Sequence, residues 1–180
     1  MTRLAAVARD ALAPADQAIW DRIAVGRNGR VGGPYTALLH VPALADRVAA
    51  LGDYFRGEAA LPTADIELTI LATVREAGAR YAWARHEVRA RAEGARPEAI
   101  EVLRANGSLD GLTLRERLLA EIARSLLRTR GIPDELFARG LAELGERQLV
   151  ELVTLIGHYI LVGCVLNGFA VPPPDDGPTF

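Results

Sequence analysis

Histidine is the residue type in this sequence that could do acid–base chemistry near neutral pH. The 180-residue chain holds three, His40, His86 and His158. Each is a candidate general acid or base, because imidazole titrates close to neutral pH. No HxxxH or HExxH spacing joins them, and the single cysteine, Cys164, cannot build a cysteine-based zinc site. We therefore expect chemistry without a metal or a redox cysteine pair.

The segment around His86 has the composition of a pocket. On a helix, Ala79, Ala82, Trp83 and His86 share one face. Two small residues there would leave space beside an aromatic ring and a titratable group, as a ligand site requires. In the alternative interpretation, Trp83 fills the core and His86 bonds a backbone carbonyl, which is the more common role of a lone histidine in a helical protein.

Glu67 is the second candidate because it interrupts an apolar segment. It lies between Ile66 and Leu68, where burying a carboxylate is costly unless the group is paired. Pairing with His86 would satisfy both side chains and fix the imidazole tautomer. Alternatively, Glu67 faces solvent in the first turn of its helix.

Helices must position these residues, and the sequence predicts them almost throughout. Leu44, Val48, Leu51 and Phe55, for example, recur at helical spacing. Helices are expected from 42 to 58, from 63 to the break at Gly78, from 79 or 81 to 93, from 97 to about 106, from 113 through 126, from 131 through 144, and from 146 to the prolines after 171. No alternating segment is long enough to indicate a strand, so the expected fold class is all-α.

Several helix starts carry a local signal. Thr63 is expected to cap its helix, with Asp65 in the first turn at the positive end of the helix dipole. Thr113 and Glu116 have capping-box spacing. Pro97 is suited to the first position of a short helix. These residues predict where the chain changes direction.

One segment, Leu152 to Val171, has no charged residue and is long enough to span a membrane. We favour a buried core helix, because His158 and Asn167 interrupt the segment and three prolines stop it at once. The N-terminus lacks the apolar run of a signal peptide, so a cytoplasmic location without membrane attachment is expected. The net charge of −2 argues against a nucleic-acid partner, which would require positive charge.

A weak internal similarity relates two of the predicted helices. Glu67-Leu-Thr-Ile-Leu resembles Glu151-Leu-Val-Thr-Leu, and each segment follows a helix and a turn. The pattern suggests an internal two-fold helical repeat. In the alternative, both are simply central apolar helices with an acidic start.

The pattern Tyr81-Ala-Trp83-Ala-Arg-His86 resembles the YxWxxH motif of cysteine-free members of the carboxymuconolactone decarboxylase-like and AhpD-like superfamily. The peroxidase branch of that family has a Glu, eleven residues, Cys-x-x-Cys, three residues and a His. Glu67 and His86 occupy the outer positions at this spacing, but Ala79 and Ala82 stand where the cysteines would be.

Two other stretches are similar to the same proteins, Gly33-Pro-Tyr-Thr-Ala-Leu-Leu-His40-Val-Pro42 and the run from Val150 to Phe169. The resemblance covers residues 33 to 172 of a single domain of residues 1–180. It leaves an N-terminal helical extension of residues 1–32 and a tail of residues 172–180. The implied fold is an AhpD-like multi-helix bundle, and the implied assembly is a homo-oligomer: a dimer, trimer or hexamer.

The resemblance also implies a function. It indicates a decarboxylase, isomerase or hydrolase that acts on a small lactone, keto acid or related carboxylate. His86 would be the general acid/base and Glu67 would orient it. Substrate-binding roles are expected for five further residues: Trp83 and Tyr81 as walls of the pocket, and His40, His158 and Tyr159 as sources of a second proton donor. Arg75, Arg80 or Arg85 would anchor a carboxylate, or else lie on the surface.

Two other functions stay open. A member that kept the fold and lost the chemistry would be a non-catalytic ligand-binding or scaffold protein. A peroxidase of the AhpD type is disfavoured, because that chemistry needs an attacking thiolate and a second, resolving thiol. Cys164 alone could not supply both.

Overall fold

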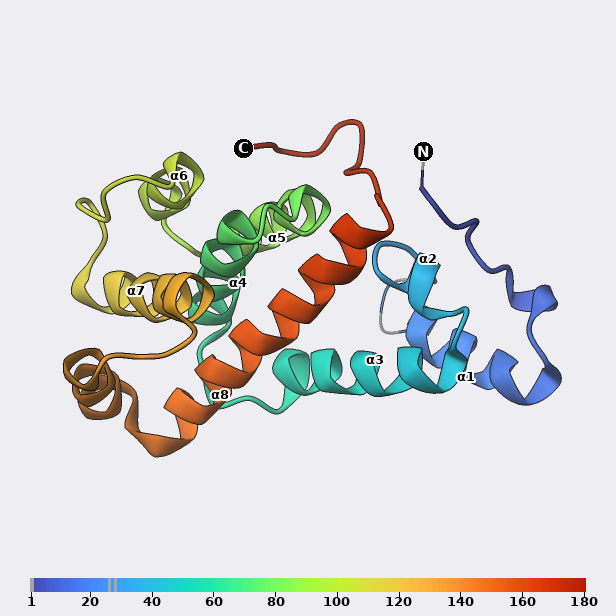
Figure 1. Cartoon of the computed structure of the whole chain (residues 1–180), viewed down its shortest axis with the longest axis horizontal. Helices are drawn as coiled ribbons and strands as arrows, with labels where there is room; N and C mark the ends of the chain where they lie inside the picture. The colour runs from blue at the N-terminus through green and yellow to red at the C-terminus, as the bar shows by residue number, and fades with distance from the viewer. Residues whose placement is uncertain (1, 26, 28) are drawn as a thin grey trace.

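The computed structural model describes residues 2–25, 27 and 29–180. Within these ranges the chain forms one short 3-10 helix and eight α-helices, and no strand occurs there (Figure 1). The elements are η1 (Arg9–Ala11), α1 (Pro14–Val25), α2 (Tyr35–Leu38), α3 (Pro42–Gly57), α4 (Thr63–Glu76), α5 (Arg80–Ala92), α6 (Pro97–Ala105), α7 (Leu114–Thr129) and α8 (Asp134–Gly168). The predicted all-α fold class is confirmed.

Helix α4 is the centre of the larger of two hydrophobic clusters. It packs against α5, α6, α7 and α8, and every residue from Ile66 to Val74 is buried. This follows from a sequence that is apolar on more than one side, because a helix of that kind can be stable only when neighbours cover all its faces. Glu67 is thereby carried into the interior.

Helix α8 runs diagonally across the molecule in Figure 1 and is broken near its start. Gly145 has φ 68° and ψ 173°, so residues 134–144 and 146–168 are separate helical segments. The two helices predicted on either side of residue 145 are therefore present. Glycine suits the break because positive φ costs it little.

The second segment of α8 is long and apolar enough to cross a membrane, and half of its most apolar window is buried within the protein. Leu152, Leu155 and Ile156 are fully buried on the side that faces the core. This is the arrangement expected for the central helix of a packed domain. The contacts of α8 with α4 and α7 support the core-helix interpretation of this segment.

A second cluster joins α1, α2 and α3 at the other end of the molecule (Figure 1). Its centre includes Ile23, Tyr35, Leu39 and Ala45. Helix α3 reaches from this cluster to α8. The junction between the two clusters is where α2, α3, α5 and α8 bring their polar side chains together.

Most capping predictions are confirmed, and one is wrong. Thr113 and Glu116 form the reciprocal capping box, and Pro97 occupies the first turn of α6. Thr63, however, is the first residue of α4 and caps nothing, because Pro62 is the N-cap. Pro62 holds φ at −56° and ψ at 142°, so the chain turns into the helix one residue earlier than the threonine signal predicted.

The two segments of the suggested repeat both lie in central helices. Their glutamates, Glu67 in α4 and Glu151 in α8, are both buried. Each is held by polar partners from another helix or loop. This likeness agrees equally with two central apolar helices, so the internal repeat stays a prediction.

Candidate functional site

The Glu67 carboxylate is buried and shared between two partners on α5. Its Oε2 lies 2.7 Å from Nδ1 of His86, and its Oε1 lies 2.9 Å from Nε of Arg89. The predicted pairing of Glu67 with His86 is therefore present, and the solvent-facing alternative for Glu67 is wrong. Two charge-assisted contacts compensate the carboxylate for the loss of water.

His86 is held between an acid and a phenol. Because Nδ1 faces the Glu67 carboxylate, it carries the proton and donates it, which leaves Nε2 as an acceptor. The hydroxyl of Tyr159 lies 3.1 Å from Nε2, in position to donate to it. The two rings meet edge to face, 5.0 Å between centroids. The His86 side chain is 18% exposed, so solvent or a ligand can reach it.

Tyr159 completes a hydrogen-bonded chain from α8 through α5 to α4. Burial and the negative charge of Glu67 raise the pKa of the Tyr159 phenol. The phenol therefore stays protonated at neutral pH. If it gives this proton to a ligand, His86 is the neighbouring group that can supply a new one. The chain Tyr159–His86–Glu67 can move a proton between a ligand and solvent.

His158 lies beside Tyr159 on the opposite side from His86. Its ring meets the Tyr159 ring edge to face at 5.2 Å. Burial, with the positive charge of Arg56, lowers the pKa of His158 to about 4, so this imidazole is neutral at physiological pH. Its Nδ1 is buried and has no hydrogen-bond partner within the described part of the chain. The structure brings His158 close to the Tyr159–His86 pair, and its substrate-binding role stays a prediction.

Tyr81 packs against the glycines of the loop before α2. The Cβ position of Gly33, with φ 62°, lies only 2.6 Å from Cε1 of Tyr81, and that of Gly32 lies 3.5 Å from its hydroxyl. Tyr81 is half-buried and joins α5 to the Gly33-Pro34-Tyr35 stretch. Its role as a wall beside the site stays a prediction.

Trp83 does not line an open space. It is fully buried, donates a hydrogen bond to Glu87 at 2.8 Å and meets Phe180 edge to face. Arg104 stacks over the same ring. The expectation that Trp83 walls a ligand pocket is therefore corrected, because packing by the C-terminal tail and α6 makes it a core residue. This is the alternative interpretation of the aromatic.

His40 is also placed away from the hydrogen-bonded chain. Its side chain is exposed, and Nε2 lies 3.0 Å from the carbonyl oxygen of Ala5 in the N-terminal segment. The expectation that His40 contributes a proton donor to the site is corrected. Nothing local in the sequence could have shown this, because the partner of His40 comes from a distant part of the chain.

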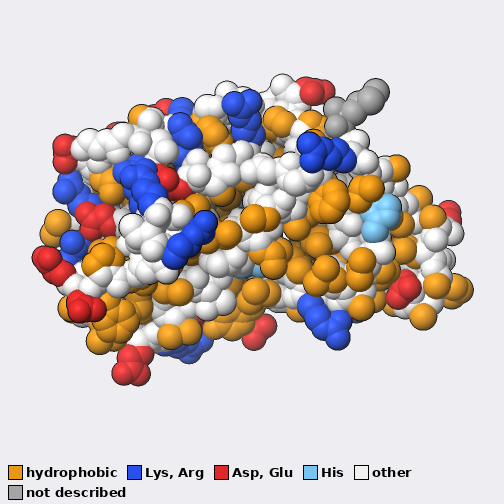
Figure 2. Space-filling view, viewed as in Figure 1, with side chains coloured by type: hydrophobic (Ala, Val, Ile, Leu, Met, Phe, Trp, Pro, Cys, Tyr) orange, Lys and Arg blue, Asp and Glu red, His pale blue; other side chains and the backbone are white. Residues whose placement is uncertain are grey.

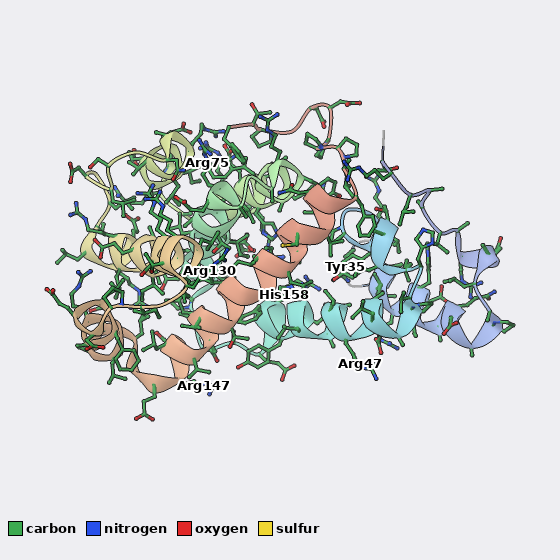
Figure 3. All side chains as sticks on the ribbon, in the orientation of Figure 1. Tyr35, Arg47, Arg75, Arg130, Arg147 and His158 are labelled. Carbon is green, nitrogen blue, oxygen red and sulfur yellow. The ribbon has the colours of Figure 1, made fainter. Side chains whose placement is uncertain are left out.

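The arginines proposed as carboxylate anchors have other surroundings. Arg75 donates to the carbonyl of Arg104 and stacks over the ring of Phe180, and Figure 3 shows Arg75 at the top of the molecule beside the tail. Arg80 and Arg85 are exposed, as in the surface alternative.

Sequence reasoning missed four polar residues near the site. Arg89 lies three positions after His86, so helical spacing could have identified it. Arg27, Tyr35 and Arg56 come from the loop after α1, from α2 and from α3. Only the tertiary structure places these three near His158 and Tyr159.

The positions of the missing cysteines are also informative. Ala79, the N-cap of α5, and Ala82, in its first turn, are both buried, and the Cβ of Ala79 lies 3.5 Å from the Cβ position of Gly163. Cys164, by contrast, is exposed on α8. No thiol therefore stands beside the Glu67–His86 pair in the described residues.

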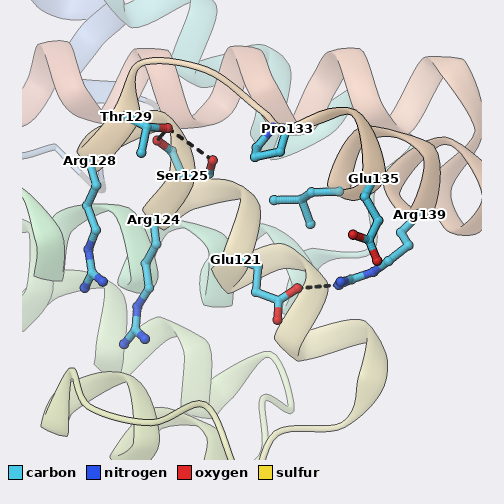
Figure 4. Close-up of a pocket in the computed structure, with 9 residues that line it drawn as sticks. Glu121, Arg124, Ser125, Arg128, Thr129, Pro133, Glu135 and Arg139 are labelled. Carbon is cyan, nitrogen blue, oxygen red and sulfur yellow. Dashed lines mark hydrogen bonds and ion pairs between the residues drawn. The ribbon is translucent and has the colours of Figure 1, made fainter.

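Two surface depressions lie elsewhere, between α7 and the first segment of α8. The one in Figure 4 has a volume of about 440 Å³. Several of its charged residues form ion pairs, as Arg139 does with Glu121 and Arg128 with Glu76. None of the site residues lines it, and we assign it no chemistry.

No protein-family model matches the chain. No curated protein matches it either. Among solved structures, a protein from Agrobacterium tumefaciens matches with a TM-score of 0.71 and 21% sequence identity, over 78% of this chain and 97% of that one. That protein is of unknown function and is provisionally described as the antioxidant defence protein AhpD. The likeness shows that this chain has an AhpD-like fold, and it confirms the fold predicted from the sequence.

Proposed function

We propose that the protein is a cofactor-independent acid–base enzyme, similar to carboxymuconolactone decarboxylase, that acts on a small lactone, keto acid or related carboxylate. The observation that carries the proposal is the hydrogen-bonded chain from Tyr159 through His86 to Glu67. A buried acid that fixes one imidazole nitrogen and leaves the other facing a donor is the arrangement that general acid–base catalysis needs. His86 and Glu67 are the proposed catalytic pair.

For a β-keto acid, the step can be written so that atoms and electrons balance. The bond between the carboxylate and its carbon breaks, CO₂ leaves, and the electron pair moves into the neighbouring carbonyl to form an enolate. Tyr159 gives its proton to that carbon. Solvent returns a proton to Tyr159 through His86, and the Glu67 carboxylate stabilises the imidazolium form. For isomerisation or hydrolysis, His86 would take a proton from substrate or water through its acceptor nitrogen, Nε2.

Peroxidase activity is not proposed for this chain, although the structural neighbour is associated with antioxidant defence. Thiol-based peroxide reduction needs two sulfurs, and alanines occupy both relevant positions, Ala79 and Ala82. Cys164 is exposed and lacks a second thiol. We assign the protein to the cysteine-free YxWxxH branch on these residues.

We expect the protein to act in the cytoplasm as a homo-oligomer, a dimer, trimer or hexamer, with a small molecule and neither nucleic acid nor membrane as its partner. Exposed apolar side chains on α3 and α8 support association of copies. They include Leu44, Leu51, Val150 and Leu161. Figure 2 shows hydrophobic side chains gathered over the half of the molecule that contains α1 to α3, with charged side chains denser at the other end.

Turnover of a panel of β-keto acids and small lactones, followed by NMR, tests the proposal. Glu67→Gln and His86→Gln should lower kcat by about 10² to 10⁴, the usual contribution of positioned proton transfer. Glu93→Gln, at an exposed position after α5, is the matched control and should keep wild-type turnover. Circular dichroism checks that each variant folds.

Two outcomes would overturn the proposal. Unchanged turnover in both site variants would show that Glu67 and His86 are not catalytic. Binding of the panel without turnover by the wild type would instead identify a ligand-binding member of the fold. Hydroperoxide turnover with a dithiol reductant that persists in Cys164→Ser would contradict the exclusion of peroxidase activity.

A further inference from the structure

Two guanidinium groups share one carboxylate at the junction of α1, α2 and α3. Arg56 forms an ion pair with Asp53, and Nη2 of Arg27 lies 3.9 Å from the same oxygen of Asp53. Arg27 also donates to the hydroxyl of Tyr35 at 2.7 Å. Together, Arg27, Arg56 and Asp53 carry one net positive charge. Burial is the largest cause that lowers the pKa of Arg27, and the positive charge of Arg56 lowers it further.

His158 faces the same place from α8. The Cβ position of Gly52 lies 3.4 Å from Nε2 of His158 and 3.7 Å from Nη1 of Arg56. Because Gly52 has no side chain, room for about one methyl group is left beside the imidazole and the guanidinium. Figure 3 shows His158 on α8 near the end of α3, with Tyr35 in helix α2.

The hydrogen-bonding state of His158 suits an acceptor ligand. The residue is more than nine-tenths buried, and its unpartnered nitrogen within the described residues is Nδ1, whereas Nε2 is the nitrogen next to Gly52. A neutral imidazole has one donor and one acceptor nitrogen. A proton on Nε2 would point toward Arg56 and Gly52, where an anion could accept it.

The region between Arg27, Arg56 and His158 can be reached from solvent. The side chains of Arg27 and Arg56 are 18% and 29% exposed. On its inner side it adjoins Tyr159, whose ring contacts both His158 and His86. A ligand held by the arginines would therefore lie next to the hydrogen-bonded chain.

We propose that Arg27, Arg56 and His158 form an anion subsite that binds the carboxylate of a small organic acid beside Tyr159. A guanidinium group offers paired donors that match a carboxylate, and Nε2 of His158 supplies a further one. One net positive charge matches a monoanion better than a dianionic phosphate. That the bound acid is the substrate rests on the proposed function; the binding itself does not.

Calorimetric titration with benzoate tests the subsite, with benzamide as the neutral molecule of the same shape and inorganic phosphate as the other anion. Wild-type protein should bind benzoate at least tenfold more tightly than benzamide or phosphate. Arg56→Gln should weaken benzoate binding by about tenfold or more, since it removes a charge-assisted contact. Arg47→Gln is the matched control, because Arg47 is exposed on the outer side of the same helix (Figure 3).

A second variant guards against misfolding of Arg56→Gln. Gly52→Ala places a methyl group in the space beside His158, and alanine favours a helix over glycine. It should fold and should also weaken benzoate binding. Equal binding of benzoate and benzamide by the wild type, or unchanged benzoate binding in both variants, would overturn the subsite.

The same titration separates this inference from the proposed function. Glu67→Gln and His86→Gln should keep benzoate binding while they lose turnover. Binding that depends on Arg56 in a protein without turnover would leave the subsite standing and remove the enzyme. Turnover by a protein whose benzoate binding is unaffected by Arg56→Gln and Gly52→Ala would leave the proposed enzyme standing and remove the subsite.

Discussion

Gly33 and Tyr81 are in closer contact than any other residue type at position 33 would allow. A Cβ on Gly33 would lie 2.6 Å from Cε1 of Tyr81, and Gly33 has φ 62°. The contact fixes the loop before α2 against the start of α5, the helix that carries His86. The positive φ of Gly33, in the loop before α2, thus helps to position His86 on α5.

Gly33→Ala should destabilise the protein by about 2–4 kcal/mol, from positive φ and from displacement of Tyr81. Gly78→Ala is the matched control. Gly78 has a similar φ of 64°, but nothing lies within 4 Å of its Cβ position, so only the backbone cost of about 1–2 kcal/mol applies. Urea unfolding measures both. Equal losses would show that the Tyr81 contact contributes nothing.

Tyr159→Phe should remove proton delivery and leave the Glu67–His86 pair in place. We expect kcat on an identified substrate to fall by about 10² or more. Stability should change by only about 0.5–1.5 kcal/mol, because one hydrogen bond is lost and the ring remains. Nitrogen NMR gives a readout independent of substrate: the signal of Nε2 of His86 should shift, while Nδ1 stays protonated. Wild-type turnover in this variant would assign proton delivery to another group.

The buried His158 should make the protein less stable in acid. Its folded pKa of about 4 lies below the ordinary value of 6.5, so the unfolded state binds more protons between these values. His158 therefore lowers the free energy of unfolding only below about pH 6.5. The loss grows as the pH decreases toward 4 and reaches about 3 kcal/mol in total. Urea unfolding at a series of pH values measures the slope.

Carboxylates also titrate in part of the range between about pH 4 and 6.5. The effect of His158 is therefore measured as the difference between wild type and variants. His158→Leu should flatten the pH dependence of the unfolding free energy relative to wild type. His40→Gln, a histidine substitution at an exposed position, is the matched control. An identical slope for wild type and His158→Leu would mean that His158 becomes protonated in the folded state as easily as in the unfolded one.

Glu151 should be a stability residue without a part in catalysis. Its carboxylate accepts hydrogen bonds from the Tyr54 hydroxyl at 2.7 Å and from the backbone amides of Ala60 and Leu61 at 2.9 and 3.0 Å. Glu151→Ala leaves these donors, of which the Leu61 amide is buried, without a partner and should cost about 2–4 kcal/mol.

Turnover per folded molecule should stay at the wild-type value in Glu151→Ala. Glu146→Ala, exposed near the start of the same helical segment, is the control and should change stability by less than about 0.5 kcal/mol. A loss below about 1 kcal/mol in Glu151→Ala would contradict the stabilising role of these three hydrogen bonds.

Local signals predicted the helices well. Thr113 with Glu116, and Pro97 at its helix start, marked boundaries correctly because capping depends on residues within one turn. Thr63 failed as a cap because its neighbour Pro62 had already set the extended backbone. The pairing of Glu67 with His86 was also predictable, since an apolar helix cannot bury a carboxylate without a partner.

The surroundings of the site were less predictable. Trp83 and His86 share a helix face, yet Trp83 is covered by Phe180 from the tail. His40 looked similar to the other histidines but bonds to Ala5. These outcomes depend on which segments pack together, and helical spacing holds no information on that.

By itself, the sequence determined the all-α class, most helix boundaries and the lack of a cysteine pair, and it favoured the pairing of Glu67 with His86 that the structure shows. These follow from periodicity, capping and residue chemistry, which act within one helix or through the cost of burial. The tertiary structure alone decided that Tyr159 completes the chain, that His158 faces Arg56 across Gly52, and that Trp83 belongs to the core. Such relationships join residues from separate helices, and the packing of whole helix faces sets which side chains meet.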